Sequence, residues 1–193
     1  MLWHAIRAVC VPQVAKVFVV LAPEDIDFSR EDWSAFEGRV APLYCGGQSR
    51  RESVYNGLVA SRDEWSADDW MLVHDAARPC LPRADLEALL ATEDEVGAIL
   101  ATPVSDTVKL VAQHRVIRTE DRSQLWLAQT PQMFRPWLLL QALQRAREPV
   151  TDDACALEQM GLQPKVVPGS RENIKVTWPE DLAMAESILR RRA

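Results

Sequence analysis

The sequence predicts a three-layer α/β fold with a mainly parallel sheet, and three observations lead to this expectation. Short runs rich in β-branched residues alternate along the chain with helical patterns. Two of these runs, 17–21 and 97–104, are apolar almost throughout, which is typical of strands buried on both faces of a sheet. A third stretch, 105–122, alternates polar and apolar residues, which predicts a half-exposed two-stranded arm. At 193 residues with 48% hydrophobic content, we expect one domain, 1–193, with this arm as its excursion.

The chain is expected to begin with a helix, because residues 2–9 place their apolar side chains at helical spacing. Strands are expected at 17–21 and 40–44. Gly46-Gly47 breaks the second pattern, and Ser49 and Glu52 then have the S-x-x-E spacing of a capping box. A helix should begin there, and its free N–H groups could meet an anion or the edge of a base. The alternative is that the capping box is purely structural.

A buried strand is expected at 70–73, and it ends at His74-Asp75. In open α/β sheets ligands bind outside the carboxyl ends of the strands, so Asp75 and Arg78 could hold a charged ligand or its metal. The alternative is that Asp75 caps the next turn and Arg78 pairs with it at the surface. His74 is expected to be a hydrogen-bonded histidine at the strand end, since no nucleophile motif accompanies it.

The second half continues the alternation of helices and strands. A helix introduced by Pro82 precedes the strand at 97–104, and the chain returns from the arm through 124–132. The remaining elements are helices at 135–147 and 153–160, the latter capped by Thr151, a short strand at 165–167, a turn or short strand at 173–177, and a last helix with a capping box at Thr177 and Glu180.

Composition excludes several classes of protein. The net charge is −6 and the 22 Lys and Arg form no long run, so the basic footprint of a nucleic-acid-binding protein is missing. No apolar stretch approaches the roughly 20 residues that cross a bilayer, and no secretory signal is visible. The four cysteines are scattered, as expected of reduced thiols rather than a zinc site. We expect a cytoplasmic protein with no nucleic-acid or membrane partner.

Six motifs occur in order along nearly the whole chain, from Leu2 onward. They are Gly46-Gly47-x-x-Arg50-x-x-Ser53-Val54, Val73-His74-Asp75-Ala76-Ala77-Arg78-Pro79, Asp106-Thr107-x-Lys109, Thr130-Pro131-Gln132, Thr151-Asp152-Asp153 and Asn173-Ile174-Lys175-Val176-Thr177. Together they resemble the 2-C-methyl-D-erythritol 4-phosphate cytidylyltransferases of the non-mevalonate isoprenoid pathway. The resemblance implies a Rossmann-like nucleotidyltransferase fold and a homodimer formed through the β-arm. It also implies an enzyme that uses Mg²⁺ and joins CTP to methylerythritol phosphate with release of pyrophosphate.

The resemblance also assigns roles to single residues, of which Asp75, Arg78 and Lys175 are the implied catalytic set. Gly47 and Ser53 match residues that contact the cytosine, and Asp75 and Arg78 match the central pair near ribose, metal and acceptor. Thr107 and Arg122 would reach the acceptor phosphate in the partner subunit, and Thr130 and Lys175 would complete that phosphate site. Taken singly, Thr107, Arg122 and Lys175 would each be ordinary solvated residues.

Two departures from the family pattern bear on activity. The family begins with a strand and a Gly-rich loop, approximately P-A-A-G-x-G-x-R-M, followed by P-K-Q, whereas Met1 of this sequence aligns with the helix after them. We expect the first strand and the phosphate-binding loop to be missing, which would weaken CTP binding. Gln48 stands where the family commonly has an Asp beside the base.

Two alternatives to this function stay open. One is a cytidylyltransferase for another polyol phosphate, such as ribitol 5-phosphate, although the set of Thr107, Arg122 and Lys175 favours methylerythritol phosphate. The other is a non-catalytic remnant that serves only as a binding module or as a dimer partner.

Overall fold

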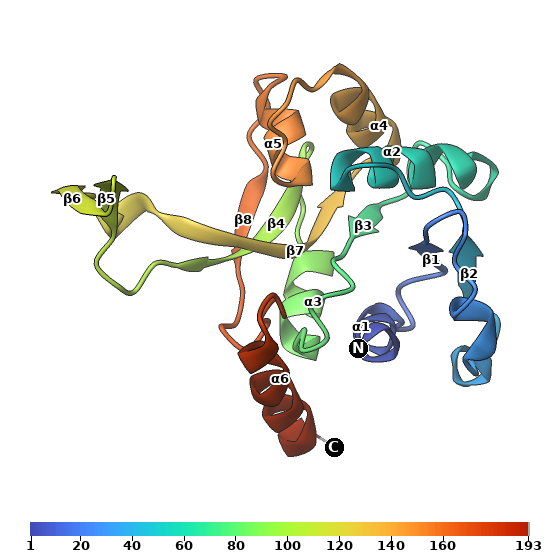
Figure 1. Ribbon diagram of the computed structural model, residues 1–193. Helices are drawn as coiled ribbons and strands as arrows, with labels where there is room; N and C mark the ends of the chain where they lie inside the picture. The colour runs from blue at the N-terminus through green and yellow to red at the C-terminus, as the bar shows by residue number, and fades with distance from the viewer. Residues whose placement is uncertain (193) are drawn as a thin grey trace.

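The computed structural model describes residues 1–192, and helices and strands alternate along this part of the chain (Figure 1). The helices are α1 (Leu2–Val9), α2 (Arg50–Ala60), α3 (Arg83–Leu90), α4 (Pro136–Arg145), α5 (Asp153–Glu158) and α6 (Pro179–Arg192). The strands are β1 (Val17–Val20), β2 (Val40–Leu43), β3 (Met71–Val73), β4 (Gly97–Pro103), β5 (Lys109–Ala112), β6 (Arg115–Thr119), β7 (Trp126–Phe134) and β8 (Lys165–Pro168). The expected α/β class is therefore confirmed, although the strands from β4 to β7 follow one another without an α-helix between them, and short 3₁₀ turns occupy parts of the connections.

The strands form three sheets. The largest has the order β3-β7-β4-β8, β1 pairs with β2 in a parallel ribbon, and β5 pairs with β6 in the arm. Within residues 1–192, β1 and β3 each have one edge without a hydrogen-bonded neighbour. The absence of a first strand stays a prediction from the sequence.

The expectation of a mainly parallel sheet is wrong for the four-stranded sheet. β7 runs antiparallel to both of its neighbours, β3 and β4, and only β4 and β8 are parallel. The reason lies in the connection between β4 and β7. The chain leaves β4, forms the arm and comes straight back, whereas a parallel neighbour would need a crossover that returns it to the starting end.

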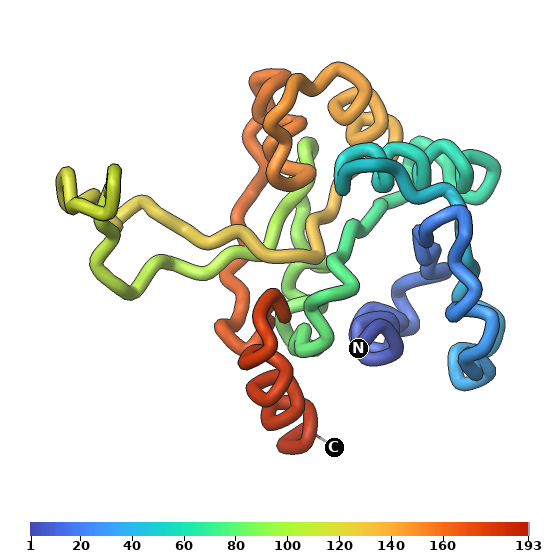
Figure 2. The backbone as a smooth tube through the Cα atoms, viewed as in Figure 1, coloured from blue at the N-terminus to red at the C-terminus, as the bar shows by residue number. Residues whose placement is uncertain are grey.

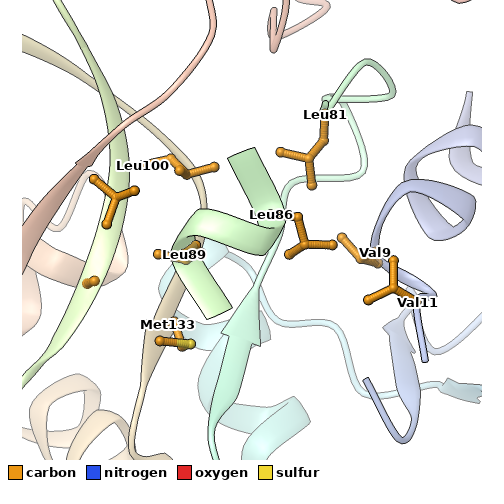
Figure 3. Close-up of a cluster of buried hydrophobic side chains, with 9 residues drawn as sticks. Val9, Val11, Leu81, Leu86, Leu89, Leu100 and Met133 are labelled. Atoms are coloured by element: carbon orange, nitrogen blue, oxygen red, sulfur yellow. The ribbon is translucent and has the colours of Figure 1, made fainter. Parts of the chain in front are cut away.

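Helices cover both faces of the four-stranded sheet, because successive side chains of a strand point to opposite faces. Ala98, Leu100 and Met133 pack toward α1 and α3, with Leu86 and Leu89 filling the space between them (Figure 3). On the other face Ile99 and Phe134 pack against the apolar sides of α2, α4 and α5. Two core clusters thus lie on the two faces of this sheet, and Figure 1 shows these helices on its two sides.

The arm lies outside both core layers. Every residue of β5 and β6 is exposed, and the backbone trace shows this pair at the far end of a long excursion from the body (Figure 2). β7 joins the two regions, because its first three residues are exposed and its last six are buried. The two-stranded pairing expected from the sequence is confirmed, but the expected half exposure is wrong, because no residue of the arm strands packs against the body.

Polar side chains fix the starts of α2, α5 and α6. The Ser49 hydroxyl accepts a hydrogen bond from the Glu52 amide at 3.1 Å, so the expected N-cap of α2 is confirmed. Asp152, rather than Thr151, caps α5 by accepting from the Cys155 amide at 3.0 Å. At α6 Asp181, rather than Glu180, reaches back to the chain that precedes the helix. Among the described residues no helix combines the length and apolar character that a bilayer crossing requires.

Candidate active site

Three cations surround one carboxylate at the carboxyl end of β3. Oδ1 of Asp75 accepts a hydrogen bond from Nε of Arg50 at 3.0 Å. Oδ2 lies 3.0 Å from Nζ of Lys175 and 3.9 Å from Nε of Arg78. Only 13% of the Asp75 side chain is exposed, whereas 48% of the Lys175 side chain is. Burial alone would raise the pKa of Asp75, but Arg50 and Lys175 outweigh it and hold that pKa below its ordinary value.

Arg50 divides its guanidinium between two carboxylates. While Nε donates to Asp75, Nη2 donates to Oδ2 of Asp153 at 2.8 Å. Burial by itself lowers the pKa of Arg50, but the two carboxylates outweigh it and the net shift is upward. Asp153 is fully buried at the first turn of α5, and this burial raises its pKa although Arg50 opposes the change. The first turn of α2 is thereby tied to both β3 and α5.

A second set of hydrogen bonds holds the backbone of Asp75. The Asp75 amide donates to Oγ1 of Thr130 at 2.9 Å, and that hydroxyl lies 3.1 Å from Nδ1 of His74. Nε2 of His74 lies 3.0 Å from the carbonyl oxygen of Arg78. A neutral ring that donates from Nε2 and accepts at Nδ1 satisfies both contacts. Burial is the main reason that the pKa of His74 is lowered to about 4, and the expected hydrogen-bonded histidine is confirmed.

Asn173 fixes the segment that carries Lys175. Its side chain is fully buried, and Nδ2 donates to the carbonyl oxygen of Thr130 at 2.9 Å. Its own carbonyl oxygen accepts from Nη1 of Arg78 at 2.6 Å. On the other side of Lys175, the amide of the next residue, Val176, donates to the carbonyl oxygen of Ala77 at 2.8 Å. The backbone on either side of Lys175 is therefore anchored, while its side chain is half exposed.

Gly47 and Ser53 lie together at the start of α2. The Gly47 amide donates to the Ser53 hydroxyl at 3.0 Å, and this hydroxyl donates to the carbonyl oxygen of Ser49 at 2.9 Å. A Cβ atom at Gly47 would come within 2.3 Å of the Glu52 side chain, so the close approach favours glycine there. Arg50 connects this turn to Asp75.

Thr107 and Arg122 lie at the base of the arm, and both are exposed. Arg122 donates to the carbonyl oxygen of Ser105, in the segment between β4 and β5. Within residues 1–192 no hydrogen bond or ion pair joins either residue to Asp75, Arg78 or Lys175. The structure thus brings Asp75, Arg78, Thr130 and Lys175 together, places Gly47 and Ser53 beside them through Arg50, and leaves the two arm residues apart.

Sequence reasoning missed how Arg50 and Asp153 work together. Both stand within motifs, but they are separated by 103 positions, and their pairing has no local signature. The sequence showed only that one motif contains Arg50 and that another contains the adjacent carboxylates of Asp152 and Asp153.

The carboxylates of this site do not form a metal cage by themselves. Among the described residues no three His, Cys, Asp or Glu side chains lie close enough to hold a metal ion. Asp153 is fully buried and bound to Arg50, so Asp75 is the carboxylate of the cluster that a ligand could reach. Mg²⁺ commonly takes one or two carboxylates and completes its shell with substrate phosphates and water, and a single Asp75 fits that pattern.

Known proteins resemble this chain over its whole length. Residues 1–191 match the family described as IspD: 2-C-methyl-D-erythritol 4-phosphate cytidylyltransferase. The cytidylyltransferase of Nitrosomonas eutropha is 50% identical over 199 residues, which cover all of this chain and 85% of that protein. The 2-C-methyl-D-erythritol 4-phosphate cytidylyltransferase of Dechloromonas aromatica is 51% identical over 196 residues, which cover all of this chain and 86% of that enzyme.

Solved structures agree with the sequence matches. A crystal structure of 4-diphosphocytidyl-2C-methyl-D-erythritol synthase has a TM-score of 0.87 and 38% identity, covering 97% of this chain and 89% of its own. The 2-C-methyl-D-erythritol 4-phosphate cytidylyltransferase of Thermus thermophilus has a TM-score of 0.80 and 30% identity, covering 98% of this chain and 88% of its own. The strand-end carboxylate with its converging cations thus belongs to a fold shared with nucleotidyltransferases, and this chain is a member of the 2-C-methyl-D-erythritol 4-phosphate cytidylyltransferase family.

Proposed function

We propose that the cluster around Asp75 is the site where this cytidylyltransferase transfers the cytidylyl group of CTP to 2-C-methyl-D-erythritol 4-phosphate. The products are 4-diphosphocytidyl-2-C-methyl-D-erythritol and pyrophosphate. The observation that carries the assignment is the convergence of Arg50, Arg78 and Lys175 on one carboxylate at the end of β3. Both substrates are polyanions, so a site rich in cations favours their approach and their binding.

The chemistry needs charge neutralisation more than proton transfer. An oxygen of the acceptor phosphate is already ionised at neutral pH, and it attacks the α-phosphorus of CTP. A new P–O bond forms there while the bond to the β-phosphate breaks, and the electron pair leaves with pyrophosphate. Catalysis then depends on in-line positioning and on stabilising negative charge, so no general base is required.

Lys175 is suited to bind the acceptor phosphate. Its ammonium group lies 3.0 Å from Asp75, but its side chain is half exposed, so it can exchange that carboxylate for a phosphate. Arg78, on the loop after β3, is the second cation available to the reacting groups. In this proposal Asp75, Arg78 and Lys175 are the catalytic residues, because they touch the substrates or the ion that accompanies them.

The hydroxyl groups of the site are engaged within the protein, and substrate binding must replace some of these bonds. Thr130 contacts both the Asp75 amide and His74, so it can donate to the acceptor phosphate only if its proton leaves Nδ1 of His74. Gly47 and Ser53 are bonded to each other and would exchange this bond for contacts with the cytosine. Each of these exchanges replaces one hydrogen bond by another, so its net cost is small.

Asp75 is the residue that would hold Mg²⁺, together with the phosphates of CTP. When bound, the ion would neutralise charge on the triphosphate. The protein's own contribution is to keep the Asp75 carboxylate ionised through Arg50 and Lys175 and to present it at the end of β3.

We also propose a homodimer formed through the arm. Its aliphatic side chains are solvent-exposed, with Val116 at 61%, Ile117 at 57% and Val111 at 52%. An exposed apolar surface of this kind is typical of a surface that pairs with a partner. Thr107 and Arg122 lie beside it and would reach the acceptor phosphate in the other subunit. A sedimentation measurement should then give twice the mass of 21.8 kDa.

A cytoplasmic location and the absence of nucleic-acid and membrane partners stay predictions from the sequence.

The experiment that tests the function is pyrophosphate release by the purified 193-residue chain. We expect release from CTP only when methylerythritol phosphate is present, and replacement of CTP by the other nucleoside triphosphates should reduce it. Faster turnover with ribitol 5-phosphate would assign the other acceptor. Absence of release with every acceptor, together with no binding of CTP in a calorimeter, would identify a non-catalytic relative.

A further inference from the structure

We infer that Arg50 and Asp153 are positioning residues for Asp75, and that together they keep one oxygen of the Asp75 carboxylate available to a ligand. The inference rests on the proposed function, because it assumes that Asp75 meets the substrates or their ion. Neither Arg50 nor Asp153 is needed for any bond that the transfer makes or breaks.

The first argument comes from the division of the Arg50 guanidinium. A free guanidinium tends to bind a carboxylate with two parallel N–H groups, which would occupy both oxygens. Here Nε donates to Oδ1 of Asp75, while Nη2 is drawn away to Asp153. Oδ2 of Asp75 is therefore left to Lys175, whose half-exposed side chain can withdraw when a ligand arrives.

The second argument comes from the burial of Asp153. Its side chain is fully buried, and Oδ1 has no hydrogen-bond partner among residues 1–192. Arg50 is the cation that the structure gives to Oδ2. A buried carboxylate is costly unless it is paired, so a carboxylate at this position serves chiefly to hold Arg50.

The third argument is that Asp153 stands on a fixed base. The neighbouring Asp152 accepts from Nε2 of Gln132 at 2.8 Å and from the Cys155 amide. Oε1 of Gln132 accepts from the Ala154 amide at 3.0 Å. Gln132 is a fully buried residue of β7. Its hydrogen bonds therefore fix the start of α5 to the sheet whose strand β3 leads into Asp75.

Two substitutions at Asp153 separate positioning from charge. Asp153→Ala removes the acceptor, so we expect Arg50 to turn both of its N–H groups to Asp75. Asp153→Asn keeps an oxygen that accepts from Nη2 and places its amide group where Oδ1 has no partner. The Asn variant should therefore retain the wild-type arrangement. A role that depended only on the charge of Asp153 would make the two variants behave alike.

Arg51 provides a matched control. It stands next to Arg50 on α2, pairs with Glu148 at 2.8 Å and donates to the carbonyl oxygen of Leu143 in α4 at 2.9 Å, and neither bond involves Asp75. Arg51→Ala thus removes contacts from α2 to α4 and to the segment between α4 and α5, and it leaves the Asp75 carboxylate untouched. The melting temperatures of all variants report how much stability is lost when the Arg50–Asp153 or the Arg51–Glu148 interaction is removed.

The measurements are crystal structures of the variants and titration of the 193-residue chain with Mn²⁺ in the presence of CTP. We expect Asp153→Ala to show a two-pronged contact of Arg50 with Asp75 and to weaken Mn²⁺ binding by about 10- to 100-fold, as losses of supporting residues do elsewhere. Asp153→Asn and Arg51→Ala should stay within about threefold of the wild type, a small part of that range.

Three outcomes would overturn the inference: an unchanged single contact in Asp153→Ala, equal losses in Asp153→Ala and Arg51→Ala, or equal losses in the Ala and Asn variants. If Asp153→Ala does not fold, Arg50→Lys replaces it, because an ammonium group cannot divide a fork between two carboxylates. Wild-type Mn²⁺ affinity in Arg50→Lys would contradict the inference. If the wild-type chain itself binds no Mn²⁺, the proposed metal role of Asp75 fails, and the crystal structures alone decide the positioning.

Discussion

Asp75 is held by side chains from several parts of the chain, whereas the arm is held by little besides its own two strands. Arg50 comes from α2, Thr130 from β7 and Lys175 from the loop before α6, and all three bond to Asp75. The arm strands β5 and β6 pair with each other and are exposed along their whole length. Both regions are connected through β7, which is buried at one end and exposed at the other.

The difference separates a cluster that draws its groups from several parts of one chain from a surface that the chain leaves without a partner. The Asp75 carboxylate and the Asp75 amide already have partners within the protein, so their geometry is organised before a ligand binds. On the arm, aliphatic side chains such as Ile117 meet solvent and gain nothing from their present position. Substitutions in the two regions should therefore be detected by different measurements.

The largest effect is expected from Lys175→Ala. Loss of this ammonium removes a positive charge from the site where phosphate charge develops, and kcat should fall by about 100- to 1000-fold. Because the side chain is half exposed, the melting temperature should change little. The measurement is pyrophosphate release at saturating substrates. Lys165→Ala, at an exposed position of β8, is the control, and an equal loss in both variants would remove Lys175 from the catalytic set.

A smaller effect is expected from the partly buried His74, and it depends on pH. The pKa of this ring falls from 6.5 to about 4 on folding, so the folded protein keeps the ring neutral while the unfolded chain takes up a proton. The stabilisation is fully present above pH 6.5 and is lost as the pH falls from 6.5 toward 4. Over this range the free energy of unfolding should drop by about 3 kcal/mol.

The comparison that isolates His74 is with His74→Asn, which has no group that titrates in this range but can still accept from Thr130. Urea unfolding of both proteins at a series of pH values gives the difference curve, in which the contributions of groups common to both proteins cancel. Parallel curves for the two proteins would show that His74 is protonated in the fold. The lowered pKa of Asp75 acts in a separate window, since stability from that group is lost only below 3.8.

Local patterns made much of the fold predictable from the sequence. Apolar runs predict β1 and β4, and the alternation in 105–122 predicts the arm, because the polar and apolar faces of a strand leave a period of two in the sequence. The antiparallel direction of β7 could not be read in the same way. Direction depends on how the chain returns to the sheet, and neither strand carries that information in its own residues.

In the candidate site, too, the local sequence predicts some features and leaves others to the arrangement of the elements in space. Asp75 and Arg78 could be predicted because a strand that ends in charged residues marks the ligand edge of an α/β sheet. The link from Arg50 to Asp153 could not, since it joins helices 103 residues apart and depends on how both pack against β7. Periodicity predicts which face of an element is buried, whereas a bond between two elements requires their arrangement in space.

The smallest effect on the fold is expected from Ile117→Lys in the arm. This substitution also tests the contrast between the arm and the Asp75 cluster most directly. The side chain is 57% exposed, so the free energy of unfolding of the monomer should change by less than about 0.5 kcal/mol. If the arm forms the dimer, a charge at its centre should reduce the sedimentation mass to that of one chain. Val166→Lys, at a 43% exposed position of β8, should leave the mass unchanged. A monomeric Ile117→Lys that keeps full activity would show that Thr107 and Arg122 do not serve the partner's site, and the Asp75 cluster would then be complete within one chain.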